Sequence, residues 1–405
     1  MIEGVIPNDM SDGLFEQIIE EAAFYWFQRN HAVDSPFYTL KNLIELDRRL
    51  AGLLRLMASL DGFHDFLNSG FNSETELEFY CAIGAASPMR NINLFQIIKN
   101  SIKLNSNTNE IVNMLSWVEY KSISGLLRKL WESDNTELQN IALGVWKNHR
   151  KKTDIDLPAA MNSSDPETRA ISAQFAGEMG MTQHLEQIAA LLNDDNEKVR
   201  FWAAYSVILL GGDQGLSLLF NTIQEQKEQK NLAIQLTFPI LTEKDATKWI
   251  NTLSRNDNLL QETIKSFEVV GLSRFIPWLI SLTKSPSTAP FAAHAFCTIT
   301  GMSIESEDFG ELIPILGDPT AIDSEDFEKA VKAIGKIDFN ALWTKYNNRF
   351  SNESRYFFGK TITDKNMSVI LKNGNQQQRK RAALEQAILS PEKELFQHRA
   401  PGFRQ

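Results

Sequence analysis

The residues best able to bind a metal or attack a substrate are six histidines and two cysteines, Cys81 and Cys297. Two ligands on one helix face need a separation of three or four residues, and a cysteine zinc site commonly uses a Cys-x-x-Cys pair. No two histidines have the first spacing, and no Cys-x-x-Cys pair occurs. His294 lies in the apolar run AAHAF, which favours a hydrogen-bonded core histidine. The sequence therefore predicts no metal site, although a site assembled from distant residues stays open.

Phosphate-binding and acyl-transfer motifs are the next candidates for chemistry. The run GGDQG at 211–215 follows a predicted helix and lacks the Gly-Lys-Ser/Thr ending of a phosphate loop. No Gly-x-Ser-x-Gly elbow occurs, and acidic pairs such as Asp194 and Asp195 fall at helix starts, where the helix dipole explains them. We therefore predict no catalytic or cofactor-binding residue and expect that the protein is not an enzyme.

Two basic clusters could contact nucleic acid: KNHRKK at 147–152 and RKR at 379–381. A DNA-binding groove on helical repeats would need basic residues at the repeat period. One period after the first cluster lies EMGMTQ, which has no positive charge. The net charge of -10 also opposes approach to a phosphate backbone. The sequence predicts a solvated loop for the first cluster, places the second in a helix at 376–390, and disfavours nucleic acid as a partner.

Aromatic side chains are the candidates for protein binding, because Trp and Tyr dominate the energetics of many interfaces. Residues 24–27 read FYWF, so these side chains must point to all sides of a helix, and some are core while others can anchor a partner. We predict that Phe201, Trp202 and Tyr205 lie at the centre of a protein-binding surface, although a core position is the competing interpretation.

The elements that position these residues form a repeat. Asp134, Asp165 and Asn196 open three segments that superpose when each is shifted along the chain by one constant interval. The same shift relates three alanines and three small apolar residues (Ala142, Ala173 and Ala204; Val145, Ala176 and Val207). Gly180 maps onto Gly211, and each glycine is expected to close a helix. The period, about 31 residues, is the length of one helix pair with two turns, as in HEAT-like solenoids.

Within one repeat, Ser164 and Glu167 have the spacing of a capping box. Weaker copies of the repeat end at Gly271 and Gly301, which are also about one period apart, whereas 221–250 fits the register poorly. Strand signals are nearly absent. We predict an all-α, HEAT-like α-solenoid of about 31-residue helix pairs with a helical N-terminal cap and a basic C-terminal segment.

Charge is distributed unevenly along this fold. Residues 345–405 carry twelve Lys/Arg against five Asp/Glu, whereas 305–328 holds nine acidic residues and no basic one. The basic segment is therefore expected to dock on acidic repeats of the same chain or to be solvated, with an anionic ligand as the alternative. Four segments are predicted: a helical cap at 1–128, repeats at 129–303, an acidic connector at 304–344 and the basic segment at 345–405.

The apolar runs and the cysteines of the sequence indicate where in the cell the protein is located. The N-terminal residues lack a basic region followed by an apolar one, which disfavours a secretory signal. The longest apolar run, at 201–210, is too short to cross a bilayer. Two widely separated cysteines fit a reducing compartment. A cytoplasmic protein with no membrane partner is expected.

Three stretches resemble an uncharacterised bacterial HEAT-repeat family: Glu20 to Leu50, Asp194 to Gly211, and the ending QQQRKRAALEQAILSPEKELFQHRAPGFRQ. The residues that match its motifs are Glu21, Trp26 and Arg29 near the N-terminus and Arg399, Pro401, Gly402 and Arg404 in the tail. Genes of the family often lie near those of type VI secretion spikes and PAAR-type toxins.

The resemblance implies a cytoplasmic chaperone or adaptor that binds a secreted effector, toxin or spike component. It assigns no catalytic residue. We expect the matching residues to hold the two ends of the solenoid together, with contact to a partner as the alternative for Trp26 and Arg29. Three rival functions stay open: an immunity protein that binds a toxin, a HEAT-like enzyme of the bilin-lyase kind, and a nucleic-acid binder.

Overall fold

A computed structural model describes residues 8–69, 76–104, 106–151, 153, 155–302 and 324–405. The chain divides into two compact units. Unit 1 comprises Met1–Asp34, Tyr38–Met179 and Gln397–Gln405, and unit 2 comprises Ser35–Phe37 and Gly180–Phe396. The predicted repeat segment at 129–303 therefore contributes to both units.

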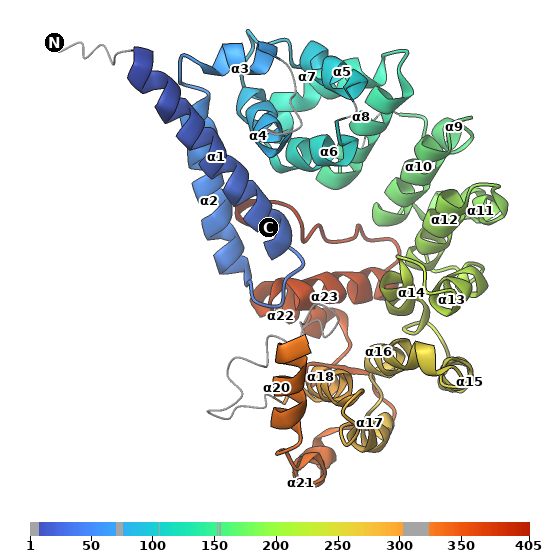
Figure 1. Cartoon of the computed structure of the whole chain (residues 1–405). Coiled ribbons are helices and arrows are strands. Elements are labelled where there is room, and N and C mark those ends of the chain that lie inside the picture. Colours follow the sequence, from blue (N-terminus) through green and yellow to red (C-terminus); the bar gives the residue numbers. More distant parts are fainter. Residues whose placement is uncertain (1–7, 70–75, 105, 152, 154, 303–323) are drawn as a thin grey trace. The chain divides into compact units, whose positions relative to one another are not determined.

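Unit 1 is built from helices (Figure 1). They are α1 (Asn8–Ala32), α2 (Leu40–Met57), α3 (Phe63–Ser69), α4 (Glu76–Ala86), α5 (Leu94–Lys103), α6 (Thr108–Trp117), α7 (Tyr120–Trp131), α8 (Thr136–His149), α9 (Leu157–Met161), α10 (Pro166–Glu178) and the short C-terminal helix η8 (Gly402–Arg404). Helices α4, α6, α8 and α10 pack one against the next, and α3, α7 and α9 pack beside them. Helices α1 and α2 pack together, and α1 covers α4.

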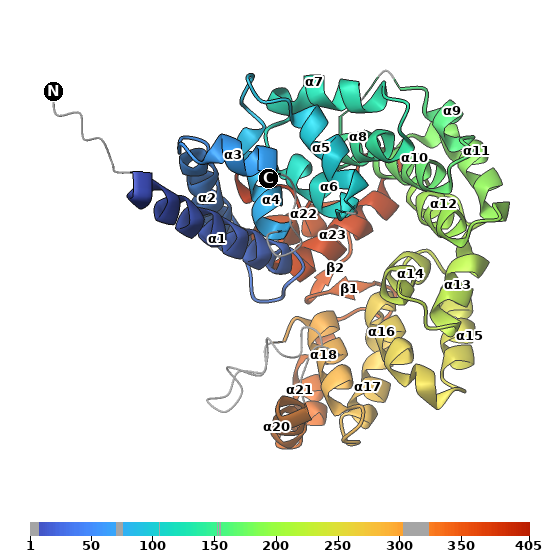
Figure 2. The same cartoon turned by 45° about the horizontal axis from the view of Figure 1, so that its top comes forward.

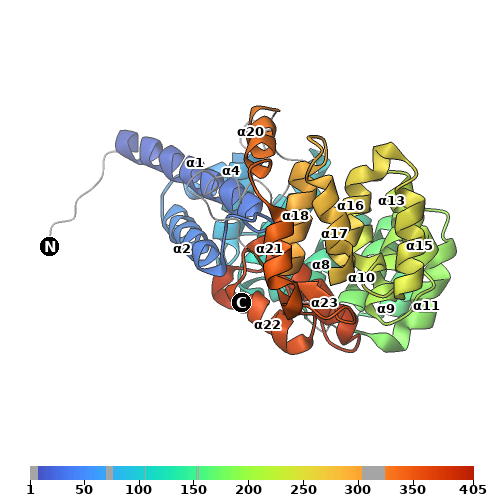
Figure 3. The ribbon, with the colours of Figure 1, turned by 90° about the horizontal axis from the view of Figure 1, so that it is seen from below.

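Unit 2 repeats this two-layer plan. Its helices are η2 (Thr182–His184), α11 (Leu185–Ala190), η3 (Leu191–Asn193), α12 (Glu197–Leu209), α13 (Leu216–Gln224), α14 (Lys230–Thr237), α15 (Glu243–Leu253), η4 (Asp257–Leu259), α16 (Leu260–Val270), η5 (Ser273–Phe275), α17 (Ile276–Leu282), α18 (Ala289–Thr300), α20 (Ser324–Ile334), α21 (Phe339–Tyr346), η7 (Asn347–Arg349), α22 (Asp364–Asn373) and α23 (Gln376–Leu389). Helices α12, α14, α16 and α18 form one layer, and α11, α13, α15 and α17 form the other. Helix α17 packs against both α18 and α21, and the three helices are seen next to one another from below (Figure 3).

The first helices of successive pairs begin at a nearly constant interval. Their first residues are Glu76, Thr108, Thr136, Pro166, Glu197, Lys230, Leu260 and Ala289. Each interval is roughly 30 residues, so the all-α solenoid predicted from the sequence is confirmed. The stretch at 221–250, which fits the sequence register poorly, supplies α14 and α15 in register. Helices α4 and α6, within the predicted cap, already follow the same interval.

The repeat is visible in individual contacts of α10 and α12. Asp165 caps α10 and Asn196 caps α12, each accepting a hydrogen bond from the helix's first turn. Arg169 donates to the carbonyls of residues 163 and 164, and Arg200, one repeat later, donates to those of 194 and 195. The cap of α10 is thus Asp165, and the predicted capping box of Ser164 does not form. In α8 the cap is Asn135, the residue after the predicted start.

A small hairpin was not predicted. Strands β1 (Tyr356–Phe357) and β2 (Lys360–Thr361) pair antiparallel beside α18 (Figure 2). Phe358 and Gly359 form its two-residue turn with φ of 48° and 68°, the left-handed conformation of the turn that favours tight hairpins. The Phe-Gly pair replaces the usual Asn-Gly signal, which explains why the sequence did not indicate it.

Two predictions can be compared with the structure only over the described residues. About half of the predicted acidic connector, residues 304–323, lies outside them, while its remainder contains α20 and most of α21. In the described part of the chain, no helix is both long and apolar enough to span a membrane.

Candidate functional site: the docked C-terminal segment

In unit 2, the hairpin packs against the ends of α16 and α18. Tyr356 N–H donates to the Gly271 carbonyl at 2.8 Å, and Phe358 N–H donates to the Thr298 carbonyl at 2.6 Å. Gly271 and Gly301 close the two helices with φ of 69° and 67°. A Cβ on either glycine would lie 2.5 Å from the backbone of the hairpin. Each of the two positions therefore requires glycine for two reasons: the backbone is left-handed, and the hairpin backbone approaches too closely for a side chain.

Arginine side chains satisfy the last carbonyls of α16. Arg355 donates to the carbonyls of Val269 and Val270, each at 3.0 Å. Arg381, on α23, donates to the carbonyls of Glu268 and Val269, each at 3.2 Å. The final carbonyls of a helix have no partner within the helix and carry partial negative charge, so cations are favourable there. The basic C-terminal segment thus caps a repeat helix of its own unit, as one of the sequence hypotheses proposed.

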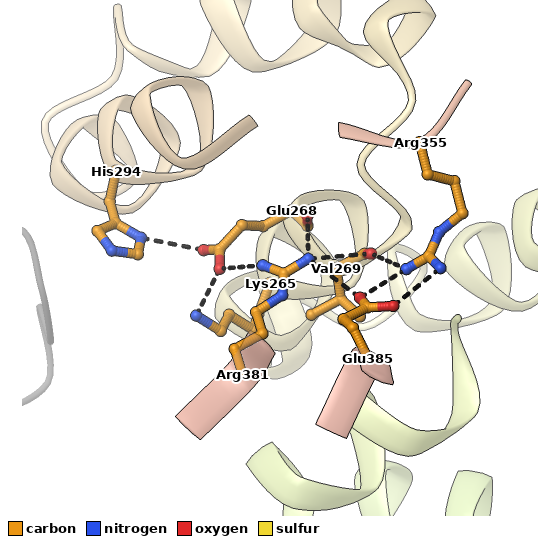
Figure 4. A network of polar contacts seen from close by, with 7 residues as sticks. All are labelled: Lys265, Glu268, Val269, His294, Arg355, Arg381 and Glu385. Atoms are coloured by element: carbon orange, nitrogen blue, oxygen red, sulfur yellow. Dashed lines mark hydrogen bonds and ion pairs between the residues drawn. The ribbon is translucent and has the colours of Figure 1, made fainter. Parts of the chain in front are cut away.

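These arginines belong to a buried polar network centred on Glu268 (Figure 4). The Glu268 carboxylate contacts Lys265 at 2.7 Å, His294 at 3.0 Å and Arg381 at 3.1 Å. Burial opposes ionisation of this carboxyl, but Lys265, His294 and Arg381 together hold the pKa of Glu268 well below its usual range. The charge on Glu268 is therefore stable at neutral pH. His294 thus makes the expected hydrogen bond, although its side chain is partly exposed, at 14%.

The second carboxylate of the network is Glu385. It accepts two hydrogen bonds from Arg355, at 2.8 and 3.0 Å, in the bidentate geometry that suits a guanidinium. The Arg381 guanidinium also lies over the Phe357 ring at 4.3 Å. Helix α23, the hairpin and helix α16 are thus joined through one set of charges.

The first basic cluster is not the solvated loop that the sequence predicted, and each cluster contains a buried arginine. Arg379 is 1% exposed and donates to the Leu371 carbonyl at 2.6 Å. Arg150 forms a buried ion pair with Glu178 at 2.6 Å and donates to the Lys147 carbonyl. The physical reason is the same in both cases: each guanidinium satisfies a carbonyl in the last turn of a helix. A run of basic residues in the sequence does not by itself show that its arginines bond to helix carbonyls.

Unit 1 binds the last residues of the chain around Asp47. This fully buried carboxylate of α2 accepts from Arg29 Nε at 3.1 Å, from Trp117 Nε1 at 2.7 Å and from the Gly402 N–H at 2.6 Å. Arg29 also donates to the Arg399 carbonyl, and the Arg399 side chain pairs with Asp34. A Cβ on Gly402 would lie 2.8 Å from Ile44, so the tail approaches α2 closely.

Arg404 fixes the end of the tail to α6. Its guanidinium donates to the carbonyls of Ser116 at 2.6 Å and Val118 at 3.1 Å, and lies 3.2 Å from His149 Nδ1. His149 Nε2 lies 3.0 Å from the Leu115 carbonyl. Burial, the largest cause, and the nearby Arg404 lower the pKa of His149 to about 4. A neutral His149 donates from Nε2 and accepts from Arg404 at Nδ1.

The structure therefore brings together Arg29, Arg399, Gly402 and Arg404, four of the residues that matched the family motif. Pro401 is buried beside Gly402. Trp26 is buried too, but its indole donates to Glu110 at 3.3 Å, and Glu21 is exposed.

Asp47, Trp117 and His149 were not predicted from the sequence as functional residues. One signal for Asp47 existed: it replaces an apolar residue in the buried stripe of α2, between Leu43 and Leu50. An acid at such a position needs a buried donor. No sequence signal identified which donor it would be.

The predicted aromatic surface is mostly core. Phe201 and Tyr205 are 5% and 3% exposed and belong to the hydrophobic core of unit 2. Trp202 is partly exposed and packs edge-on against both rings, at centroid distances of 5.4 and 5.2 Å. A role of this group in protein binding stays a prediction, and it depends on Trp202 for access to a partner.

Groups that could do chemistry are spread thinly. Among the described residues, no three His, Cys, Asp or Glu side chains are placed to hold a metal ion. Burial raises the pKa of both Cys81 and Cys297, so neither thiol is ionised at neutral pH. A cavity of about 330 Å³ in unit 1 is lined by apolar side chains, by amide side chains such as Asn93, Gln96 and Asn100, and by His64. Amide groups both donate and accept hydrogen bonds, which suits binding of a polar ligand.

Comparison with known protein families agrees with the repeat architecture. Residues 156–235 match the model of the HEAT repeats family. A crystal structure of an engineered protein is similar at 15% identity and a TM-score of 0.23, covering 92% of this chain and 99% of that one. None of the curated proteins compared with the chain matches it. The class of protein is thus an all-α solenoid that contains HEAT repeats.

Proposed function

We propose that the protein is a scaffold that binds another protein on its helical repeats. The observation that carries the proposal is the run of like helix pairs, whose first helices begin at intervals of roughly 30 residues from Glu76 to Ala289. Stacked pairs of this kind, including HEAT repeats, form extended surfaces that generally mediate protein–protein interactions.

The polar clusters favour binding over catalysis. Glu268 and Arg381 in unit 2, and Asp47 and Arg29 in unit 1, are all buried. Their hydrogen bonds hold the chain's own C-terminal residues. Because the arginines of the two basic clusters are also used internally, they contribute little to a surface for nucleic acid.

We further propose that the partner is a secreted effector, toxin or spike component of type VI secretion, and that the protein is its cytoplasmic chaperone or adaptor. The resemblance of both ends and the middle of the chain to a family encoded near such genes supports this step. The tail residues that match the family are occupied within unit 1, so the partner is expected to bind elsewhere.

The test is affinity purification of the tagged protein from its native host, followed by mass spectrometry. A toxin or spike protein should be recovered, and it should be lost from a host that lacks the secretion genes. Recovery of no partner from cells that express these genes would overturn the proposal. Deleting the gene separates the adaptor from an immunity protein, because loss of an adaptor abolishes secretion, whereas loss of an immunity protein kills cells that carry the toxin.

A further inference from the structure

Helix α1 presents an exposed stripe that the contacts described so far do not use. Phe24 and Phe27 are 55% and 51% exposed and point away from the buried face of α1 that carries Trp26. Glu16, Glu20 and His31 share their side, because positions 16, 20, 24, 27 and 31 follow the helical repeat of about 3.6 residues. We call these five residues the α1 stripe. Two phenylalanines this exposed, one turn apart, are typical of an interaction site.

The phenylalanines are held in place. The Phe27 ring packs on His31 with centroids 4.2 Å apart, and His31 Nδ1 lies 2.9 Å from the Phe27 carbonyl. Phe24 packs edge-on against Tyr25 at 5.8 Å. Tyr25 is itself hydrogen-bonded to Arg49 at 3.0 Å. A partner would therefore meet ordered rings, which lowers the entropy lost on binding.

The other end of the stripe is acidic. Glu78, on the neighbouring helix α4, is repelled electrostatically by the carboxylates of Glu20 and Glu16. Burial first, and then these two carboxylates, raise the pKa of Glu78 above its usual value. Three like charges that repel one another would be stabilised by an incoming cation.

We propose that the α1 stripe is the docking site for an amphipathic helix of a partner protein, with aliphatic residues against Phe24 and Phe27 and basic residues against Glu16, Glu20 and Glu78. This inference rests on the proposed scaffold function and names the surface and the chemistry of its partner. The carboxylates disfavour the alternative of an anionic lipid surface.

The spacing of the stripe residues along α1 predicts the spacing of aliphatic and basic residues in the partner helix. At about 1.5 Å per residue, Glu20 lies about 6 Å from Phe24 along the axis, and Glu16 about 16 Å from Phe27. A partner helix of about three to four turns spans this length. Its aliphatic residues recur at three- and four-residue spacing, and its lysines or arginines lie one to three turns away.

The first test uses a synthetic helical peptide of about 16 residues, with leucine on one face and lysine at one end. A control peptide carries glutamate in place of lysine. Fluorescence anisotropy should show binding of the lysine peptide and at least tenfold weaker binding of the control. Phe24→Ser with Phe27→Ser should weaken lysine-peptide binding about tenfold or more, whereas Phe37→Ser, at a phenylalanine that is 58% exposed in unit 2, should leave it unchanged.

Charge is tested separately, because a basic peptide could bind any acidic surface. Glu16→Lys with Glu20→Lys should weaken binding about tenfold and reduce its salt dependence. Glu132→Lys with Glu137→Lys makes the same change in net charge at exposed positions elsewhere in unit 1 and should have little effect. Equal effects of the two charge reversals, or no effect of the phenylalanine variant, would overturn the α1 site.

The native partner separates this inference from the scaffold proposal. If the wild-type protein recovers a partner and the Phe24→Ser/Phe27→Ser variant recovers it equally well, the α1 stripe is not the docking site, although the scaffold function stands. If the wild type recovers none, the scaffold proposal itself fails. Self-association of the wild type that the same variant abolishes, measured by light scattering, would instead assign the stripe to a second copy and contradict the inference.

Discussion

The two units hold C-terminal residues with different chemistry. In unit 2, Glu268 is surrounded by Lys265, His294 and Arg381, and two arginines cover the end of α16. In unit 1, Asp47 has one cationic partner, Arg29, and otherwise accepts from an indole and a main-chain N–H. The anchor of unit 2 is thus an ionic network, whereas that of unit 1 depends more on neutral donors.

This difference has consequences for pH and for tolerance to substitution. Several cationic partners lower the pKa of a carboxylate, so the carboxylate keeps its negative charge to a lower pH. The neutral His149 of unit 1, in contrast, begins to favour the unfolded state as soon as the pH falls below the ordinary histidine pKa. We therefore expect unit 1 to lose its tail contacts at a higher pH than unit 2 loses its hairpin contacts.

The largest effect is expected for Glu268→Gln. The variant removes the carboxylate that pairs with both Lys265 and Arg381, and it leaves the buried Arg381 with only the more distant Glu385, at 3.8 Å; breaking such a buried pair costs about 4 kcal/mol. Urea unfolding should show this loss in the free energy of unfolding of unit 2. Glu243→Gln, which breaks an exposed pair with Arg274, is the control and should cost less than about 1 kcal/mol. Equal losses would show that the Glu268 network contributes no more than a surface pair.

Asp47→Asn should destabilise unit 1 by about 3 kcal/mol, because Arg29 would remain buried without a charged partner. Glu45→Gln, close to it on α2, breaks an exposed pair with Arg49 and is expected to change stability by less than about 1 kcal/mol. The two variants can be compared by thermal or urea unfolding. An unchanged stability of Asp47→Asn would contradict the assignment of Asp47 as the anchor of the tail.

Gly271→Ala tests the close approach of hairpin and helix. The left-handed conformation and the contact with the Tyr356 carbonyl together should cost about 2 to 3 kcal/mol. Gly125→Ala on α7 meets nothing within 4 Å and should be neutral or slightly stabilising. If Gly271→Ala were equally neutral, the hairpin would not lie against the end of α16.

The pH dependence of unit 1 should follow His149. Its pKa is about 4 when folded and about 6.5 when unfolded, so the unfolded state takes up a proton first as the pH falls. Stability is therefore full above about pH 6.5 and decreases toward pH 4, with a loss of about 2 kcal/mol between pH 7 and pH 5. His149→Gln should remove most of this dependence in urea unfolding at the two pH values. A variant with the wild-type pH dependence would place the titrating group elsewhere.

The fold could be predicted where local signals agree with the repeat. Gly180, Gly211, Gly271 and Gly301 all adopt positive φ at helix ends, as the sequence indicated. The sequence did not identify helix α4 as part of a repeat. Its residues from Phe79 to Ala86 are all buried, so the helix has no amphipathic stripe.

The anchors were harder to predict because their partners are distant in the sequence. Arg381 and Glu268 are 113 residues apart, and Gly402 and Asp47 are 355 apart. A buried acid can be suspected from its apolar neighbours, but the donor that satisfies it is chosen by the tertiary fold. For the same reason, arginines that cap helix ends looked like solvated charge.

Hydrogen exchange of the wild-type protein at neutral pH tests most directly whether the C-terminal segment is an integral part of both units. The main-chain amides of the hairpin, of α23 and of Gly402 should exchange as slowly as those of α16 and α6, because they are buried by the same contacts. Rapid exchange throughout residues 354–362 and 397–405, with the repeat helices still protected, would contradict this account and make the segment an appendage that the repeats do not hold.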